Sequence, residues 1–116
     1  MVKSHNDVCA VKGAVAVTLD DSPGILVQAG PTLLYSAHFA NTVAGISYLQ
    51  LFDAVQLSDV TLGTTTPTVV IPVLTSGVLS MDLAKPLYFN KGLCAFSTTT
   101  ATGSSAAVQH GTFFYA

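Results

Sequence analysis

The chain has 116 residues, of which 50% are hydrophobic and 9% are charged, and its formal net charge is −2 at pH 7. This length suits one folded domain, and charged residues reach only about a third of the usual share of about 25%. There is no arginine and the four lysines do not cluster, which argues against nucleic-acid binding and against arginine forks that clamp phosphate or carboxylate groups.

The sequence also argues against a membrane or exported protein. No run approaches the roughly 20 consecutive apolar residues of a membrane-spanning helix, and residues 1–7 do not have the pattern of a signal peptide. We therefore expect synthesis in the cytoplasm, where Cys9 and Cys94 are more often reduced thiols than a disulfide. A surface poor in charge is typical of a protein that is part of a larger assembly. Alternatively, the apolar residues simply fill the core of the domain.

The first part of the chain predicts an arm followed by short strands. Residues 1–12 are expected to form an N-terminal arm or a first edge strand, and residues 13–116 a single domain. Small and apolar residues over 8–19 suit one or two strands. Residues 20–24, Asp-Asp-Ser-Pro-Gly, predict a turn, because Asp and Ser side chains bond to local amides and Pro-Gly fixes the reversal.

The middle of the chain predicts the strands of a core. Residues 25–28 predict a short strand. Residues 32–41 alternate with the period of a half-buried strand, which should turn Tyr35 and Phe39 towards the core. Residues 46–54 predict a central strand whose two faces are both apolar enough to be covered.

The remaining sequence continues this pattern of short strands and turns. A loop over residues 55–66 precedes a strand over 69–73, and Pro72 places that strand at a sheet edge or a bulge. No amphipathic helix is found. Together the pattern predicts an all-β fold, a single antiparallel β-sandwich of about eight short strands, of which a jelly roll is one form. Further strands are expected over residues 78–83, 87–89, 93–98 and 111–115.

Two groups of residues have the chemistry of a site but lack its context. His5, Asp7 and Cys9 alternate, so an extended segment would point three metal-ligand types the same way. Structural zinc sites draw closely spaced Cys and His pairs from two places, and the second half is missing, so we predict no metal site. In place of a metal site, we expect His5, Asp7 and Cys9 to belong to a flexible polar arm.

Ser36, His38 and Asp53 invite comparison with a catalytic triad, since Ser36 and His38 share one face of a strand and Asp53 ends the next. The sequence has no nucleophile elbow and no Gly-rich oxyanion loop beside them. We therefore predict a protein that is not an enzyme, with no catalytic residues and no cofactor.

The two ends of the chain are the candidate partner contacts. Phe113, Phe114 and Tyr115 are consecutive, and successive strand residues face opposite ways, so a terminal strand cannot easily bury all three. We expect one of them to dock onto a neighbouring molecule. The arm that carries His5 and Asp7 could add a strand to a partner's sheet edge, or it could be a disordered terminus.

Residues 33–105 resemble small structural proteins of tailed bacteriophages and prophages. Five pieces in order carry the resemblance: the opening strand from Leu33-Leu34-Tyr35 to Asn41-Thr42, Tyr-Leu-Gln-Leu-Phe-Asp-Ala at 48–54, Gly-Thr-Thr-Thr-Pro at 63–67, the proline-containing strand at 69–73, and Leu-Tyr-Phe at 87–89 leading to Ala-Thr-Gly-Ser at 101–104. The resemblance implies a virion component with no activity and no catalytic residues.

Within that group we expect a capsid decoration or cement protein on the capsid surface, made in the host bacterial cytoplasm. Its partners would be the major capsid protein and neighbouring copies of itself, as a trimer or dimer, with no nucleic acid and no membrane. The alternative is a tail, fibre or head-tail connector module that uses loops 55–67 and 101–107 to meet a receptor or neighbouring tail proteins. A small hydrolase would need a pocket with a perturbed acid or base.

Overall fold

The strands pair from the outside of the sequence inward, the first with the last, the second with the second-last and so on, as in a long hairpin. The computed structural model describes residues 13–19, 24–42 and 44–116, so the expected arm with His5, Asp7 and Cys9 lies outside the described residues. Within that part, β1 pairs with β8, β2 with β7, β3 with β6 and β4 with β5, all antiparallel. The strands are β1 (Gly13–Leu19), β2 (Ile25–Ala29), β3 (Thr32–Asn41), β4 (Ser47–Asp53), β5 (Val69–Val73), β6 (Val78–Phe89), β7 (Gly92–Thr98) and β8 (Gln109–Tyr115), with a short 3₁₀ helix, η1 (Leu57–Asp59).

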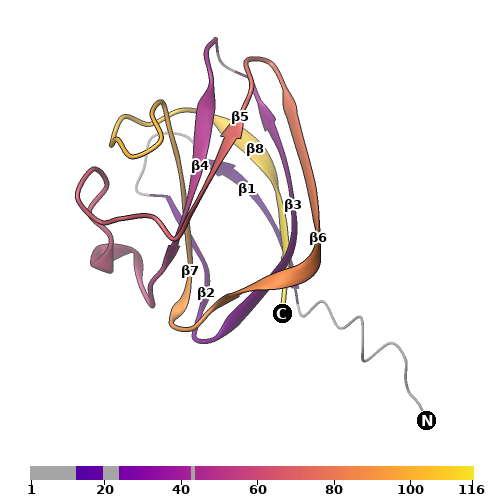
Figure 1. Ribbon diagram of the computed structural model, residues 1–116, viewed down its shortest axis with the longest axis vertical. Helices are drawn as coiled ribbons and strands as arrows, with labels where there is room; N and C mark the ends of the chain where they lie inside the picture. The colour runs from indigo at the N-terminus through magenta and orange to yellow at the C-terminus, as the bar shows by residue number, and fades with distance from the viewer. Residues whose placement is uncertain (1–12, 20–23, 43) are drawn as a thin grey trace.

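These pairs lie in two facing sheets (Figure 1). Sheet A has the order β1-β8-β3-β6 and sheet B has the order β2-β7-β4-β5. Two four-stranded antiparallel sheets in this order form a jelly roll. The prediction of an all-β antiparallel sandwich is confirmed, and the strand order settles which form it takes.

The core lies between the sheets and is made of alternate residues of each strand. Phe39 of β3 and Phe113 of β8 meet in sheet A with ring centroids 4.8 Å apart. Leu49 and Leu51 of β4 face them from sheet B and are fully buried. Burying each such side chain stabilises the fold by about 1.5–3 kcal/mol. The buried members of this core are Val27, Leu34, Ala37, Phe39, Leu49, Leu51, Phe89, Leu93, Ala95 and Phe113.

A β-bulge at Tyr35 changes which residues of β3 face the core. Leu34 pairs with Tyr115 of β8 and Ser36 pairs with Phe114, so two steps along β3 match one step along β8. The extra residue shifts the alternation, as bulges do. Leu34 is therefore fully buried and Tyr35 is only half-buried, which corrects the expectation that Tyr35 faces the core; the expectation for Phe39 is confirmed.

Two of the five prolines lie in edge strands. Pro72 lies in β5, the edge of sheet B, as predicted. The two strands expected over 78–83 and 87–89 are one strand, β6, at the edge of sheet A. Between the pairs Ser36–Asp82 and Leu34–Leu87 the register slips, so Pro86 lies in a stretch without ladder pairing. An edge strand tolerates such a stretch, and it blunts the edge against pairing with another chain.

Two loops cover the outer face of sheet B. The rings of Phe52 and Phe96 meet edge to face there, with centroids 5.5 Å apart. Leu57 and Leu62 of the β4–β5 loop, residues 54–68, pack against this aromatic pair. Under the β7–β8 loop the buried Gln50 amide donates to Thr98 Oγ1 at 2.6 Å. The central strand β4 is thus buried on both faces, as predicted, and the loops create a second small core outside the sandwich.

Candidate functional site

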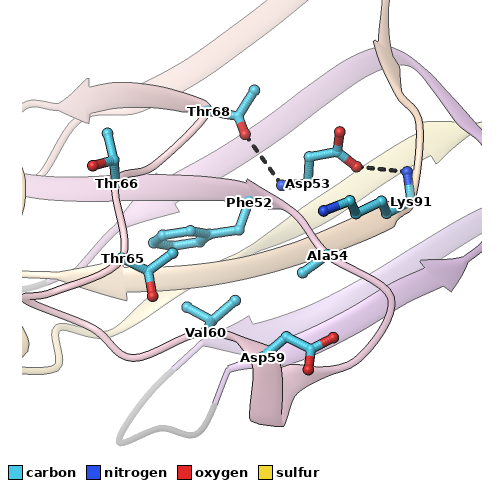
Figure 2. A pocket seen from close by; sticks show the side chains of 9 residues that line it. All are labelled: Phe52, Asp53, Ala54, Asp59, Val60, Thr65, Thr66, Thr68 and Lys91. Carbon is cyan, nitrogen blue, oxygen red and sulfur yellow. Dashed lines mark hydrogen bonds between the residues drawn. The ribbon is translucent and has the colours of Figure 1, made fainter.

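A pocket of about 250 Å³ opens where the β4–β5 loop leaves sheet B. Figure 2 shows apolar side chains at its centre and polar ones around them. Its charged groups come from three separate elements: the end of β4, η1 and the β6–β7 turn. The residues that line it are Phe52, Asp53, Ala54, Asp59, Val60, Thr65, Thr66, Thr68 and Lys91.

Asp53 is fixed at the edge of this pocket by the turn between β6 and β7. Its carboxylate accepts hydrogen bonds from the backbone N–H groups of Lys91 at 2.7 Å, Asn90 at 3.2 Å and Gly92 at 3.3 Å. Its own N–H donates to Thr68 Oγ1 at 3.1 Å (Figure 2). Hydrogen bonds to a charged acceptor are the stronger kind, so Asp53 ties the turn to sheet B and orients Lys91.

The two other charges of the pocket are less constrained. Asp59 is exposed and accepts one hydrogen bond from the Gln56 side-chain amide, at 3.3 Å. The Lys91 ammonium forms no ion pair or hydrogen bond within the described part of the chain. Figure 2 shows this side chain extending beneath Asp53 towards the centre of the pocket. The pocket therefore presents both hydrogen-bond donors and acceptors to whatever enters it.

The structure does not bring Ser36, His38 and Asp53 together. Ser36 and His38 lie on β3 in sheet A, whereas Asp53 lies on β4 in sheet B. His38 instead contacts two β6 side chains, with Nδ1 3.0 Å from Ser80 Oγ and Nε2 3.3 Å from Asp82 Oδ1. This second Ser-His-Asp group was not predicted. It spans β3 and the edge strand β6 of sheet A, and Ser80 and Asp82 are open to solvent.

The three C-terminal aromatics divide as strand alternation requires. Phe113 is fully buried in the core, and Tyr115 packs against the same core from the end of β8. Phe114 faces the other way, half-buried, with its ring edge-on to His38 at 5.9 Å. Of the three candidate partner contacts, Phe113 has no exposed surface, because β8 is an interior strand; a contact through one of the other two stays a prediction. Phe114 is the outward-facing residue of the three.

Cys94 lies in the second small core beneath the β4–β5 loop. It is a free, fully buried thiol whose Sγ lies 3.6 Å from the Ala54 carbonyl oxygen. Burial raises its pKa from 9.0 to about 11, and the nearby Asp59 carboxylate acts in the same direction. A thiol with so high a pKa is a poor nucleophile at neutral pH, so Cys94 acts as a packing residue.

Apolar side chains are exposed at one end of the sandwich. Val78 is 78% exposed, Leu74 is 68% exposed and Ile46 is 41% exposed. They are neighbours because Ser47 pairs with Val73 and because Leu74 and Val78 flank the β5–β6 turn. We call Ile46, Leu74 and Val78 the apolar end; it includes the β5–β6 turn at the top of Figure 1.

The Asn41 side chain holds the backbone of the apolar end in place. Its amide nitrogen donates to the carbonyl oxygens of Gly45 at 2.9 Å, Val73 at 3.0 Å and Leu74 at 3.1 Å. Its side-chain oxygen accepts a bond from Ser47 Oγ at 3.0 Å. This buried side chain joins the β3–β4 loop to the β5–β6 turn, so the exposed apolar residues stand on an ordered support.

Comparisons with known proteins return no match. No family model, curated protein or solved structure resembles the chain closely enough to be matched. Among the described residues, no three His, Cys, Asp or Glu side chains are grouped as a metal ion would require, and no helix is long and apolar enough to cross a membrane.

Proposed function

We propose that the chain is a non-enzymatic structural protein of a bacteriophage virion, and more narrowly a capsid decoration protein that binds and stabilises the assembled head shell. The virion context comes from the resemblance of residues 33–105 to phage structural proteins. The jelly roll supports it as a compact unit with a complete core, although this fold also serves many other functions. Its partners would be the major capsid protein and further copies of the chain.

The apolar end is the observation that carries the proposal. Exposed apolar side chains grouped on an ordered support are typical of protein interaction sites. No charged residue occurs in residues 41–52 or 69–81, which include the β3–β4 loop, β5 and the β5–β6 turn. A contact made here would bury apolar area, which is worth about 25 cal/mol per Å² and is insensitive to salt. Repetition of such a contact over a shell would reinforce the shell without chemistry.

The first test is the amount of this protein in purified particles, measured against the major capsid protein by quantitative mass spectrometry. A copy number equal or simply proportional to that of the capsid protein is expected for decoration of the shell. Absence from purified particles would overturn the proposal. A count of about 3, 6 or 12 copies per particle would place the protein at the tail or connector, where ring symmetry sets the number.

The second test addresses the contact surface. Leu74→Asp and Val78→Asp place a charge in the apolar end, and each is expected to abolish co-sedimentation with particles that lack the protein. Both side chains are exposed, so the thermal midpoint should change little. Val55→Asp, a matched change of an exposed valine in the β4–β5 loop, is the control and should still bind. Unchanged binding of both apolar-end variants would move the contact elsewhere, with Phe114 as the next residue to change.

The pocket favours a second candidate, a tail, fibre or connector module. Such modules meet receptors or neighbouring proteins through loops on a rigid scaffold. Residues 54–68 form a pocket of this kind, and Gly63 in this loop lies beside Ser104 of the β7–β8 loop. The two candidates differ in copy number, so the particle measurement separates them.

A further inference from the structure

The pocket beneath the β4–β5 loop is built before any ligand arrives. Hydrogen bonds within the loop join Val60 N–H to the Leu57 carbonyl at 3.0 Å and Thr65 N–H to the Thr61 carbonyl at 2.8 Å. The Thr68 N–H returns the loop to sheet B by donating to the Leu51 carbonyl at 2.8 Å. Because the loop is already ordered, a ligand that binds there loses little free energy to ordering it. This favours binding even of a small molecule.

The polar groups of the pocket can both donate hydrogen bonds to a ligand and accept hydrogen bonds from it. Thr68 Oγ1 accepts a bond from the Asp53 N–H, and Thr65 Oγ1 accepts one from the Thr61 N–H. Each of these hydroxyl groups keeps its own hydrogen to donate. Asp59 adds acceptor oxygens and Lys91 adds donor hydrogens.

The balance of charge narrows the class of ligand. The two carboxylates, Asp53 and Asp59, disfavour a phosphate or another anion, and the Lys91 ammonium disfavours a metal cation. A neutral molecule that carries hydroxyl groups can pair with Asp59 and Lys91, because each hydroxyl both donates and accepts. The Asp53 oxygens already accept three backbone hydrogen bonds. Figure 2 places Phe52, Ala54 and Val60 between the polar groups. Phe52 and Ala54 are buried, so the half-buried Val60 offers most of the apolar surface that a sugar ring could contact.

From these contacts we propose that the pocket binds a single neutral saccharide unit. Its volume of about 250 Å³ lies just below the range of about 300–1,000 Å³ that is typical of pockets for larger ligands, so one ring suits it better than a chain. The proposal does not depend on the capsid role. The particle measurement can fail while sugar binding holds, and the reverse is also true.

The test is a titration of the isotope-labelled full chain followed by amide chemical shifts in NMR. The probes are glucose, galactose, mannose and N-acetylglucosamine, together with their methyl glycosides, which stand for a sugar unit at the end of a chain. At least one is expected to shift amides of residues 52–68 and 90–92, with a dissociation constant in the millimolar range, about −4 kcal/mol. If only the free sugars bind, the ligand is a free sugar. If the methyl glycosides also bind, the pocket can accept the terminal sugar unit of a glycan.

Three variants test the polar rim without touching the core. Asp59→Asn, Thr66→Ala and Lys91→Ala change exposed side chains that line the pocket, and each is expected to weaken binding about tenfold, the equivalent of one lost hydrogen bond of about 1.4 kcal/mol. Thr64→Ala on the same loop and Lys85→Ala on β6 are matched controls outside the pocket and should bind normally.

Three results would overturn the inference. The first is the absence of pocket shifts with every sugar in the panel. The second is a set of pocket shifts produced by sodium phosphate or calcium chloride but by none of the sugars, because the site would then select charge. Sugar-induced shifts that all three rim variants leave unchanged would also reject this pocket as the site.

Discussion

Replacing Phe113 with alanine is the most direct test of how β8 is placed. Phe113 is fully buried and its ring lies 4.8 Å from that of Phe39. Truncation of such a ring costs about 3–5 kcal/mol, including the cavity that it leaves, and loss of a paired aromatic places the cost in the upper part of that range. We expect a loss of about 4 kcal/mol in the free energy of unfolding. In a domain of this size that lowers the thermal midpoint by about 15 °C.

The neighbouring residue supplies the control. Phe114→Ala removes the same number of atoms from the next position of β8, but that ring is half-buried and faces outward beside His38. Its cost should be about 1 kcal/mol, or about 4 °C. Both variants are compared with the parent by calorimetry and by urea denaturation. A larger loss for Phe114→Ala than for Phe113→Ala would refute the register, because a slip of one residue exchanges the two faces of a strand.

Two further predictions concern close packing and burial. Gly111→Ala should destabilise the fold by about 3 kcal/mol or more in urea denaturation, because a Cβ there would overlap the His38 carbonyl oxygen. Gly30→Ala, at a φ of +88° with open space around it, should cost only about 1–2 kcal/mol, and equal losses would contradict the packing of β8 on β3. In a Cys9→Ser background, Cys94 should react with iodoacetamide slowly at pH 8 when folded and rapidly in urea; equal rates would contradict its burial. Because the folded pKa of Cys94 is raised to about 11, its stabilising contribution is complete below pH 9 and is lost as the pH rises towards 11, so a Cys94→Ala variant should show a weaker decline of stability over that window.

The sequence predicted the strands better than it predicted their faces. Alternation and turn residues placed β3 and β5 at the bounds that the structure has, and Pro72 identified an edge strand. The bulge at Tyr35 left no sequence signal, because the residues on both sides of it alternate normally and the extra residue is visible only against β8. The break expected between residues 83 and 87 was wrong for a related reason, since an edge strand can continue through a proline.

The candidate sites were harder to predict because they depend on contacts between distant segments. The strands expected over 87–89 and 93–98 left residues 90–92 between them, and Asp53 was placed at the end of a strand, but only the fold joins Asp53 to the backbone of residues 90–92. The same holds for Asn41. Its side-chain amide donates to the carbonyl oxygens of Val73 and Leu74, which lie 32 and 33 positions further along the chain. Sequence spacing correctly required one of the three C-terminal aromatics to face outward. It could not show that β8 lies inside a sheet, which is why Phe113 was included among the contacts.

The position of β8 also determines when sheet A can finish pairing during folding. β8 lies between β1 and β3 in sheet A, so among the described strands β1 pairs with β8 alone, nearly a hundred positions further along the chain. Pairings this distant in sequence form slowly, because a long loop must close before any contact rewards it. We therefore expect the edges of β1 and β3 that pair with β8 to stay open until β8 is made, and open strand edges are where chains aggregate. The hairpin of β4 and β5 can form first, and the remaining pairs can then close outward from it. Slow synthesis of β8, or a shortage of chaperones, should reduce the yield of folded protein even when its final stability is unchanged.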